Sequence, residues 1–449
     1  MGTFLTLNIG GMTMSIENIS QAKANIAATG AYKTLTSFFD EGSFTSVNTL
    51  AKSQDTYAEV VAGFGTVEGL PVYAFAQNSD FCGGAMSKAQ AAKIKKIYDL
   101  ALKTGAPVVG FYDSKGGRLD EGNALLAGYG EVLNSAAKLS GVVPQVSVVL
   151  GSCLGTGALN AVCADFVIVT KESKLSLDTM GNNADAESNA KSGVASVVAE
   201  DEADAVSKAR ELICYLPANN LNATPLAEAV DADGSKGCIC HSIVDDGSIF
   251  KLSKEFGSSA RTILARVEGQ VVGAINTNGD ALTADDSTKI AKFVRFCDAF
   301  SIPVITCINS KGFEDVKSAA KVTSAYAEAT TAKISVVTGT AIGALYIALA
   351  GAGANADVVY ALPEAVISPV NPEAAALIIA PEKMNVSVEE QKNVAAQFAS
   401  EHLSAENAAE CGYVDDVVTK EEIRGTIVSA LDMLMGKRVE TLSKKHSTI

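Results

Sequence analysis

Residues 93–116 read KIKKIYDLALKTGAPVVGFYDSKG, and residues 289–312 read KIAKFVRFCDAFSIPVITCINSKG. Each copy begins with apolar residues spaced as on one face of a helix, passes through a turn that contains proline, and continues as a short apolar run ending in Ser-Lys-Gly. The pattern predicts a helix, a turn and a buried strand in both copies. An internal repeat of this length indicates that the chain contains two copies of one structural unit, and single motifs are best interpreted within that repeat.

Shorter matches on both sides extend the repeat. DEGS (40–43) returns as DDGS (245–248), VEG (67–69) as VEG (267–269), and SVV (147–149) as SVV (335–337). Their order is kept while the connecting loops shorten, as two fused copies of one domain would show. Residues 216–237 are polar, acidic and rich in turn formers, which predicts a linker. We therefore expect an α/β protein with two domains, 1–220 and 221–449, that face one another across a shared cleft.

Composition narrows the class of protein. The 449 residues carry a net charge of −15, with 48% hydrophobic and 19% charged residues. Each copy can bury a core, and the acidic balance argues against a nucleic-acid interface, which needs a basic face. The nine cysteines show no CxxC spacing, which predicts a reducing, cytoplasmic compartment. We interpret Cys238-Ile239-Cys240-His241 as a loop or strand edge, because no second cysteine pair lies nearby to complete a zinc site.

Strand and helix patterns alternate along both copies. In the first copy we predict a hairpin over 60–76, a helix over 88–104, and strands over 108–112 and 145–150, which together indicate βαβ units. The uncharged run 334–356 is long enough to span a membrane. It aligns with the strand, glycine loop and helix that follow residue 147, so we predict a buried strand and core helix there, and no membrane span.

Each copy places a glycine-containing loop between a strand and a helix of small residues. The loops read GSCLGTG (151–157) and GTAIGA (339–344). A helix start of this kind presents unpaired backbone N–H groups, and small residues let a ligand oxygen come close. Neither loop has the Lys-Ser/Thr of a P-loop or the GxGxxG spacing of a dinucleotide site. A single loop of this kind is explained equally well by close packing of the helix on the strand or by a ligand site. Two such loops at equivalent positions of the repeat favour paired oxyanion holes.

Few titratable side chains are candidates for catalysis. The three histidines, at 241, 402 and 446, form no recognisable triad with serine or cysteine. Arg118 follows the Gly116-Gly117 turn and is either an anion contact or part of a surface salt bridge. Glu68 and Glu268, at the two hairpin tips, are interpreted as solvated turn residues. So few titrating groups are typical of catalysis by oxyanion stabilisation with a base supplied by a cofactor.

Longer motifs make a family resemblance specific. They are FDEGSF (39–44), VYAFAQ (72–77), KIYDLALKTGAPVVGFYDS (96–114), AGYGEV (127–132), SGVVPQVSVVLGSC (140–153), NAKSGVASVVAEDEADA (189–205), ARELICYLPANN (209–220), KFVRFCDAFSIPVIT (292–306), AYAEAT (325–330), ADVVYALP (356–363) and GYVDDVV (412–418). With these motifs the chain resembles, over nearly its whole length, the carboxyltransferase subunits of biotin-dependent acyl-CoA carboxylases and decarboxylases. That group contains the propionyl-CoA carboxylase β chains and the methylmalonyl-CoA decarboxylase α chains.

The resemblance implies two crotonase-like domains of ββα-spiral type, with a site between the first domain of one subunit and the second domain of another. It implies that Gly155 and Thr156 hold the thioester oxygen of a small acyl-CoA, and that Gly343 and Ala344 hold the ureido oxygen of biotin. Further substrate contacts are expected at Gly83, Gly84, Gly116, Gly117 and Arg118. The implied reaction moves a carboxyl group between carboxybiotin and the acyl α-carbon, in either direction.

The resemblance also implies partners. The chain has no Met-Lys-Met biotin acceptor, so biotin is expected on a separate carrier protein. Other carboxylase or decarboxylase subunits are expected beside it, and the chain itself is expected to form a dimer or a hexamer. No metal and no nucleic acid are expected.

Several positions depart from the family pattern. The family usually has two glycines at Gly155-Thr156, Ser-Gly-Gly-Ala-Arg at 114–118, a longer loop between 313 and 319, and histidine at Ser188. One alternative is therefore a catalytically reduced paralogue that serves as a structural or regulatory subunit. Another is a crotonase-type enoyl-CoA hydratase or isomerase, which the tandem halves and the linker disfavour.

Overall fold

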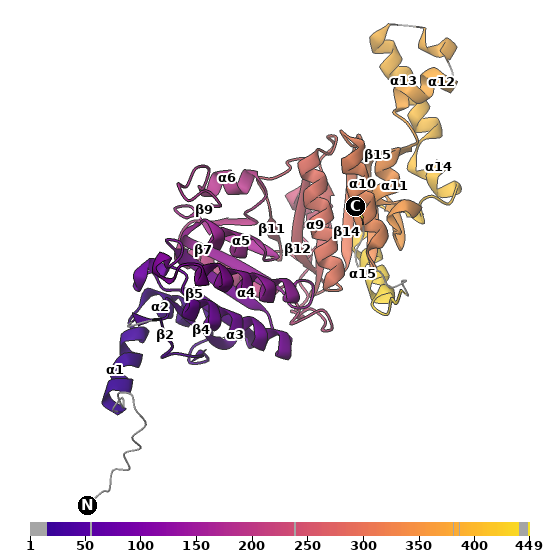
Figure 1. Cartoon of the computed structure of the whole chain (residues 1–449). Coiled ribbons are helices and arrows are strands. Elements are labelled where there is room, and N and C mark those ends of the chain that lie inside the picture. The colour runs from indigo at the N-terminus through magenta and orange to yellow at the C-terminus, as the bar shows by residue number, and fades with distance from the viewer. Residues whose placement is uncertain (1–15, 54–55, 238, 380, 386, 440–447) are drawn as a thin grey trace, which may run out of the picture.

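The computed structural model describes residues 16–53, 56–237, 239–379, 381–385, 387–439 and 448–449. Its body consists of two α/β halves that lie side by side (Figure 1). The first half contains the sheet from β1 (Thr45–Ser46) to β10 (Val197–Ala199), and the second half contains the sheet from β11 (Phe250–Leu252) to β18 (Asp416–Val417). The predicted boundary at 220/221 falls between these two sheets and stays a prediction.

The two eight-stranded sheets have the same topology. The strand order is β1-β4-β5-β6-β7-β8-β10 in the first half and β11-β12-β13-β14-β15-β16-β18 in the second, with β9 beside β7 and β17 beside β15. The first-half strands are β4 (Val60–Val67), β5 (Leu70–Gln77), β6 (Val108–Ser114), β7 (Gln145–Leu154), β8 (Phe166–Thr170) and β9 (Lys174–Ser176). Their counterparts are β12 (Ala260–Val267), β13 (Gln270–Thr277), β14 (Val304–Ser310), β15 (Lys333–Ile342), β16 (Val358–Ala361) and β17 (Val366–Ser368). The repeat predicted from the sequence is therefore confirmed.

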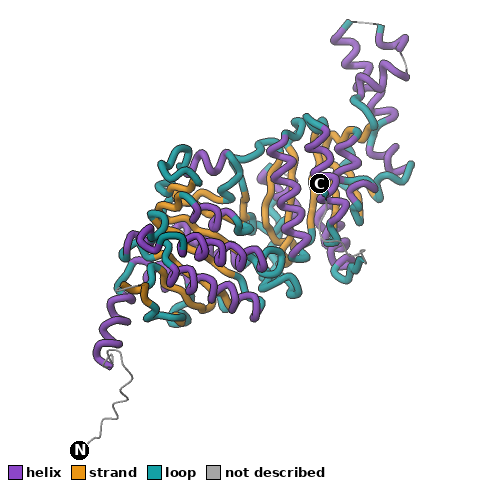
Figure 2. Tube along the Cα trace, in the orientation of Figure 1, coloured by secondary structure: helices purple, strands orange, loops and turns teal. Residues whose placement is uncertain are grey.

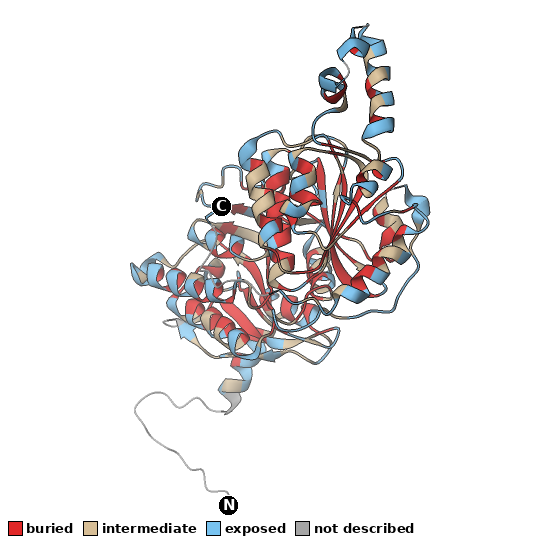
Figure 3. Ribbon diagram, turned by 90° about the vertical axis from the view of Figure 1, so that its right-hand side faces the viewer, coloured by how far each residue is buried: buried red, intermediate tan, exposed pale blue. Residues whose placement is uncertain are grey.

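Helices cover these sheets, and their buried faces and the strands form the core (Figures 2 and 3). The predicted helix over 88–104 is α3 (Lys88–Thr104), which the Ser87 side chain caps at its start and the left-handed Gly105 ends. Its counterpart is α9 (Ala284–Ala299). The remaining helices of the body are α2 (Gly30–Phe38), α4 (Ala124–Leu139), α5 (Thr156–Val162), α6 (Ala186–Lys191), α7 (Glu202–Ile213), α8 (Ile239–Ile243), α10 (Val316–Glu328), α11 (Ala344–Leu349) and α15 (Ile423–Leu434).

Two helical segments stand out from the body. Helix α1 (Ile16–Ala27) extends at the N-terminal end, and α12 (Pro372–Ile379) and α13 (Val388–His402) form an arm at the opposite end, joined to the body near α14 (Ala405–Glu410) (Figure 1). Successive apolar side chains at the end of α12 are exposed, with Ile378 at 72% and Ile379 at 68%. An arm with such a surface can pack on another protein surface.

The uncharged run 334–356 folds as predicted. It forms the buried strand β15 and the core helix α11, separated by the single residue Gly343. In the part of the chain that the structure describes, no helix combines the length and the apolar character that crossing a membrane requires. The interpretation of the Cys238–His241 cluster as a loop or strand edge is wrong for residues 239–241, which begin helix α8. Cys240 is buried in that helix, and Cys238 lies outside the described residues.

Glu68 and Glu268 lie in the exposed hairpin turns as interpreted, with 65% and 48% of their side chains accessible, and each also accepts a hydrogen bond from an arginine. Arg210 Nη2 lies 2.7 Å from Glu68 Oε1 and 3.0 Å from an oxygen of Asp40. In the second half Arg424 Nη2 lies 2.9 Å from Glu268 Oε1 and 2.9 Å from Asp245 Oδ1. We call each arginine with its two carboxylates a clamp. Neither clamp could be predicted from local sequence, because the arginines lie on α7 and α15, far along the chain from the hairpins that they bind.

The second of these clamps is more deeply buried and gives a testable stability difference. Asp245 is 2% exposed, so Arg424→Met leaves a buried carboxylate without its guanidinium. We expect this variant to lose about 2 to 3 kcal/mol of unfolding free energy. Lys420→Met breaks a pair in which both side chains are more than half exposed, and should cost about 0–1 kcal/mol. Urea denaturation followed by circular dichroism measures both, and equal losses would contradict the clamp.

Candidate active site

Both predicted glycine loops are tighter than expected. Residues 151–154 continue β7, and 339–342 continue β15, because β9 and β17 pair with these stretches. One glycine then turns the chain from strand to helix in each half. Gly155 has φ 67° and ψ −142°, and Gly343 has φ 54° and ψ −121°. L-residues rarely adopt such positive φ values, so glycine is needed at both turns.

The hydrogen bonds at the two turns also match. The Gly155 N–H donates to Ser176 O at 2.9 Å, and the Gly343 N–H donates to Ser368 O at 2.8 Å. These glycine N–H groups are therefore occupied. The N–H groups of Thr156 and Ala344 follow at the first helical position, and no hydrogen bond among the described residues uses either of them. Each half thus presents an open backbone donor directly after its glycine turn.

In each half, a side chain from the neighbouring strand accepts a hydrogen bond from the strand segment that precedes the glycine turn. Asp113 Oδ1 accepts a hydrogen bond from the Ser152 N–H at 3.2 Å, and Asn309 Oδ1 accepts one from the Thr340 N–H at 3.0 Å. A Cβ at Gly151 would lie 2.2 Å from Asp113 Oδ1, and Gly339 is equally close to Asn309. Small residues at these positions therefore let the supporting side chain approach. The sequence indicated neither support, although Asp113 and Asn309 align in the repeat.

The other predicted first-half residues lie at the same edge of the sheet. Strands β5, β6 and β7 are parallel neighbours, and the loops after their carboxyl ends carry Gly83-Gly84, Gly116-Gly117 and Gly155. The first two loops are joined: the Met86 N–H donates to Gly116 O at 2.8 Å, and the Arg118 N–H donates to Met86 O at 2.8 Å. The structure thus brings these residues to one end of the first half, while their contact with substrate stays a prediction.

The Arg118 guanidinium is already engaged by carboxylates. Its Nη1 lies 2.9 Å from Glu59 Oε1, and its Nη2 lies 2.5 Å from Asp120 Oδ2. Glu59 is fully buried, whereas 12% of the Arg118 side chain is exposed. Arg118 therefore forms an ion pair, but with a buried partner rather than at the surface as the sequence offered, and a role for Arg118 toward an anion stays a prediction.

Titrating side chains under the Gly155 turn are held protonated. Burial, together with the nearby Asp113 charge, raises the pKa of the Cys153 thiol to about 12. Burial also raises the pKa of the Tyr129 hydroxyl to about 12. A buried thiol in this state is a poor nucleophile at neutral pH. Both groups therefore stay protonated at neutral pH.

A cavity of about 670 Å³ opens beside the second turn. Gly343 and Ala344 line it together with Ile347, Ile367, Pro369 and His402, among others. All of its lining residues belong to the second half or to the arm. His402 was set aside in the sequence because it forms no triad. It lines the cavity because the end of α13 is held at β17, where the Ile367 N–H donates to Leu403 O at 3.0 Å. The first-half turn contributes nothing to this cavity within one chain.

Two halves of one topology, each with an open backbone donor after a glycine turn, define a tandem-domain α/β protein. The carboxyl transferase domain family matches residues 30–449. The methylmalonyl-CoA decarboxylase subunit alpha of Veillonella parvula is 33% identical over 93% of this chain and 92% of its own length. The methylmalonyl-CoA carboxyltransferase 12S subunit of Propionibacterium freudenreichii subsp. shermanii is 33% identical over 86% of this chain and 83% of its own.

A solved structure agrees with these relatives. Transcarboxylase 12S, with hydrolyzed methylmalonyl-coenzyme A bound, superposes with a TM-score of 0.90 at 29% identity and covers 96% of this chain and 98% of that chain. The chain therefore belongs to the carboxyl transferase domain family. The tandem crotonase-like fold and the family predicted from the sequence are both confirmed.

Proposed function

We propose that the protein is a biotin-dependent carboxyltransferase subunit that moves a carboxyl group between biotin on a separate carrier and the α-carbon of a small acyl-CoA, of propionyl- or methylmalonyl-CoA type. The observation that carries this proposal is the pair of equivalent turns, each with an N–H at Thr156 or Ala344 that donates to no partner among the described residues. The reaction needs two oxyanions to be stabilised, one on each reactant, and the chain offers one donor set for each. A cytoplasmic location belongs to the proposal.

The first-half turn would serve the acyl-CoA. The Thr156 N–H, with the Gly157 N–H beside it, would donate to the thioester oxygen as the enolate forms. Gly155 would supply the conformation rather than a donor, because Ser176 O occupies its N–H. Thr156 replaces a family glycine without loss of a donor, since its backbone N–H stays and its side chain is exposed. This departure therefore leaves the oxyanion chemistry available.

The second-half turn would serve biotin, and the residues present fit that group. The cavity beside Ala344 is walled by Ile347, Ile367 and Pro369, which suit an apolar bicyclic ring, and Ala344, whose N–H donates to no described residue, lines the same cavity and would donate to the ureido oxygen. When bound, biotin would supply the carboxyl group and the base for the acyl α-proton. That role agrees with a first-half turn whose Cys153 and Tyr129 stay protonated.

The full-length protein can be tested with free biotin and methylmalonyl-CoA. We expect release of CO2 from methylmalonyl-CoA that depends on biotin. Binding of acyl-CoA without any biotin-dependent turnover would instead indicate a structural or regulatory subunit. Addition of water to crotonyl-CoA would indicate a hydratase, and either result would contradict the proposal.

We also expect the protein to purify as a dimer or as a trimer of dimers. The cavity beside Gly343 is lined by one half only, so the acyl-CoA turn that completes the site would come from a second copy. Apolar side chains are exposed near both turns, with Met180 at 85% beside the first and Ile347 at 54% beside the second. Transcarboxylase 12S forms a hexamer assembly. Light scattering coupled to size exclusion measures the mass, and a monomer at micromolar concentration would contradict a shared site.

A further inference from the structure

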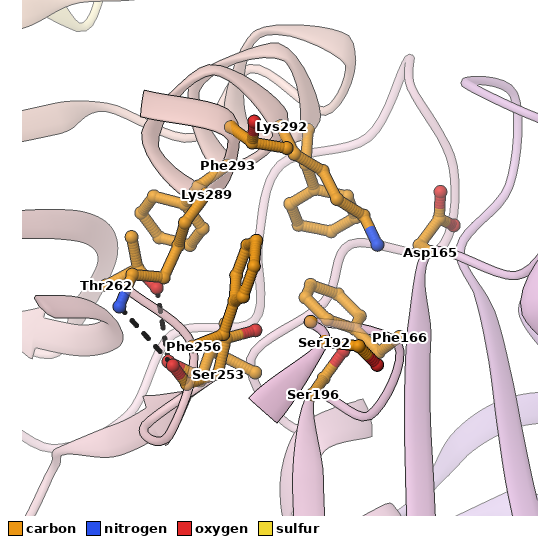
Figure 4. Close-up of a pocket in the computed structure, with 14 residues that line it drawn as sticks. Asp165, Phe166, Ser192, Ser196, Ser253, Phe256, Thr262, Lys289, Lys292 and Phe293 are labelled. Carbon is orange, nitrogen blue, oxygen red and sulfur yellow. Dashed lines mark hydrogen bonds between the residues drawn. The ribbon is translucent and has the colours of Figure 1, made fainter. Parts of the chain in front are cut away.

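A second cavity, of about 110 Å³, lies at the junction of the two halves (Figure 4). The first half contributes the start of β8 and the loop before β10, and the second half contributes β11, β12 and α9. The lining residues are Asp165, Phe166, Ser192, Gly193, Ser196, Leu252, Ser253, Phe256, Thr262, Thr288, Lys289, Lys292, Phe293 and Phe296. Its volume is well above the ~10–15 Å³ that one water molecule needs. The turns proposed for catalysis do not line it.

Contacts between the halves hold the walls in place. The rings of Phe166 and Phe296 meet edge to face with centroids 4.6 Å apart. The Ser253 N–H donates to Ser196 O at 2.7 Å across the junction. The Phe256 ring packs on Gly193, where a Cβ would lie 2.7 Å from it. The cavity is therefore a built space with aromatic walls rather than a surface groove.

Opposite charges stand at its mouth. The Lys292 ammonium points toward the Asp165 carboxylate from the other half (Figure 4), but the two groups are not within ion-pairing distance. Asp165 Oδ2 accepts the Gln145 N–H at 2.8 Å, and Lys289 Nζ donates to Ser253 O and Gly257 O. Among the described residues no hydrogen bond or ion pair uses the Lys292 ammonium. Desolvation raises the pKa of Asp165 to about 6 while Lys292 lowers it, so the carboxyl is ionised at pH 7.5.

We propose that this cavity binds a small aliphatic α-amino acid, such as L-valine, as a zwitterion. The ligand ammonium would lie at Asp165, the ligand carboxylate at Lys292, and the side chain between the phenylalanine rings. Charge-assisted hydrogen bonds of this kind are the stronger ones in proteins. The site would then join the two halves through the ligand.

The charge arrangement selects a zwitterion over simpler ligands. A carboxylic acid anion would meet Lys292 but would also face the ionised Asp165. An amine would meet Asp165 but would face Lys292. Each singly charged ligand therefore meets one mouth residue of like charge, and that repulsion costs binding free energy. A molecule with both charges and an aliphatic end satisfies all three features of the cavity.

Isothermal titration calorimetry on the full-length protein at pH 7.5 tests the site without any activity assay. We expect saturable binding of L-valine, and binding at least about tenfold weaker for isobutyrate, which lacks the ammonium, and for isobutylamine, which lacks the carboxylate. Absence of L-valine binding at millimolar concentration would overturn the proposal. Isobutyrate or isobutylamine binding as tightly as L-valine would overturn it too.

Variants locate the site. Lys292→Met and Asp165→Asn should each weaken L-valine binding at least about tenfold. Lys96→Met is the matched control, because Lys96 holds the same repeat position on α3 and its Nζ lies near Asn48 instead. Wild-type affinity in Lys292→Met, or an equal loss in Lys96→Met, would overturn the assignment. If a variant melts at a lower temperature than wild type, the comparison of the three ligands on the wild-type protein decides the question.

Discussion

Thr156→Pro is expected to lower turnover of acyl-CoA by about 100-fold to 1,000-fold while the protein still folds. Thr156 is the first residue of α5, and its N–H has no internal partner. Proline is well tolerated at this position, because the missing N–H makes no helix hydrogen bond there and its φ suits the first turn. The preceding Gly155, with φ 67° and ψ −142°, lies outside the α region that a following proline disfavours, so a proline can follow it. The substitution therefore removes one donor with little other change.

The matched control is Thr156→Ala, which keeps the N–H and removes only the side chain. We expect its turnover to stay close to that of wild type. Turnover in the biotin-dependent decarboxylation assay and acyl-CoA affinity by calorimetry are the two readouts. Similar turnover in the proline and alanine variants would show that the Thr156 N–H does not stabilise the transition state. Substituting Gly155 itself is less informative, because a Cβ there would lie 3.2 Å from Thr179 Cγ2 and would strain a backbone with positive φ.

Ala344→Pro should abolish carboxyl transfer involving biotin while acyl-CoA binding stays intact. Ala344 is the first residue of α11, and its N–H is open in the same way as that of Thr156. The two donors belong to different halves of the chain, so removing the second should not disturb the first. The expected loss of rate is again about 100-fold to 1,000-fold for one donor.

Ala344→Ser keeps the donor and serves as the control for this position. Calorimetric titration with acyl-CoA, run beside the biotin-dependent assay, separates the outcomes. Wild-type turnover in the proline variant would contradict a biotin site at this turn. Loss of both acyl-CoA binding and turnover would indicate that the halves are not independent, contrary to the assignment. Circular dichroism confirms that both variants fold before they are compared.

The class of fold could be predicted because it depends on signals within short windows. The apolar spacing of 88–104 and the Gly105 that follows it define α3, and the same signals recur in the second copy. The hairpin over 60–76 was equally clear and is formed by β4 and β5. The repeat also resolved the uncharged run at 334–356, because its counterpart in the first copy showed a strand and a helix. The family followed from motifs spread over nearly the whole chain.

The donors at the site could be predicted only approximately. The sequence indicated the two glycine turns, but it assigned donation to Gly155 and Gly343 themselves as well as to the residues after them. Ser176 O and Ser368 O occupy the two glycine N–H groups, and these partners come from β9 and β17. Such a hydrogen bond depends on where a later strand lies in the sheet, which no local pattern reports. The structure thus moves the proposed donors one residue along, to Thr156 and Ala344.

The sequence by itself determined that this protein has two copies of one α/β domain, with a glycine turn between a strand and a helix of small residues in each. Those features arise from residues that are neighbours along the chain, where periodicity and turn preferences act directly. Only the tertiary structure decided which side chains meet: Arg424 with Glu268, Asp113 with the Ser152 N–H, and Lys292 opposite Asp165. The residues of each pair are far apart along the chain, and only the folded arrangement of strands and helices brings them close enough for their charges and hydrogen-bonding groups to interact.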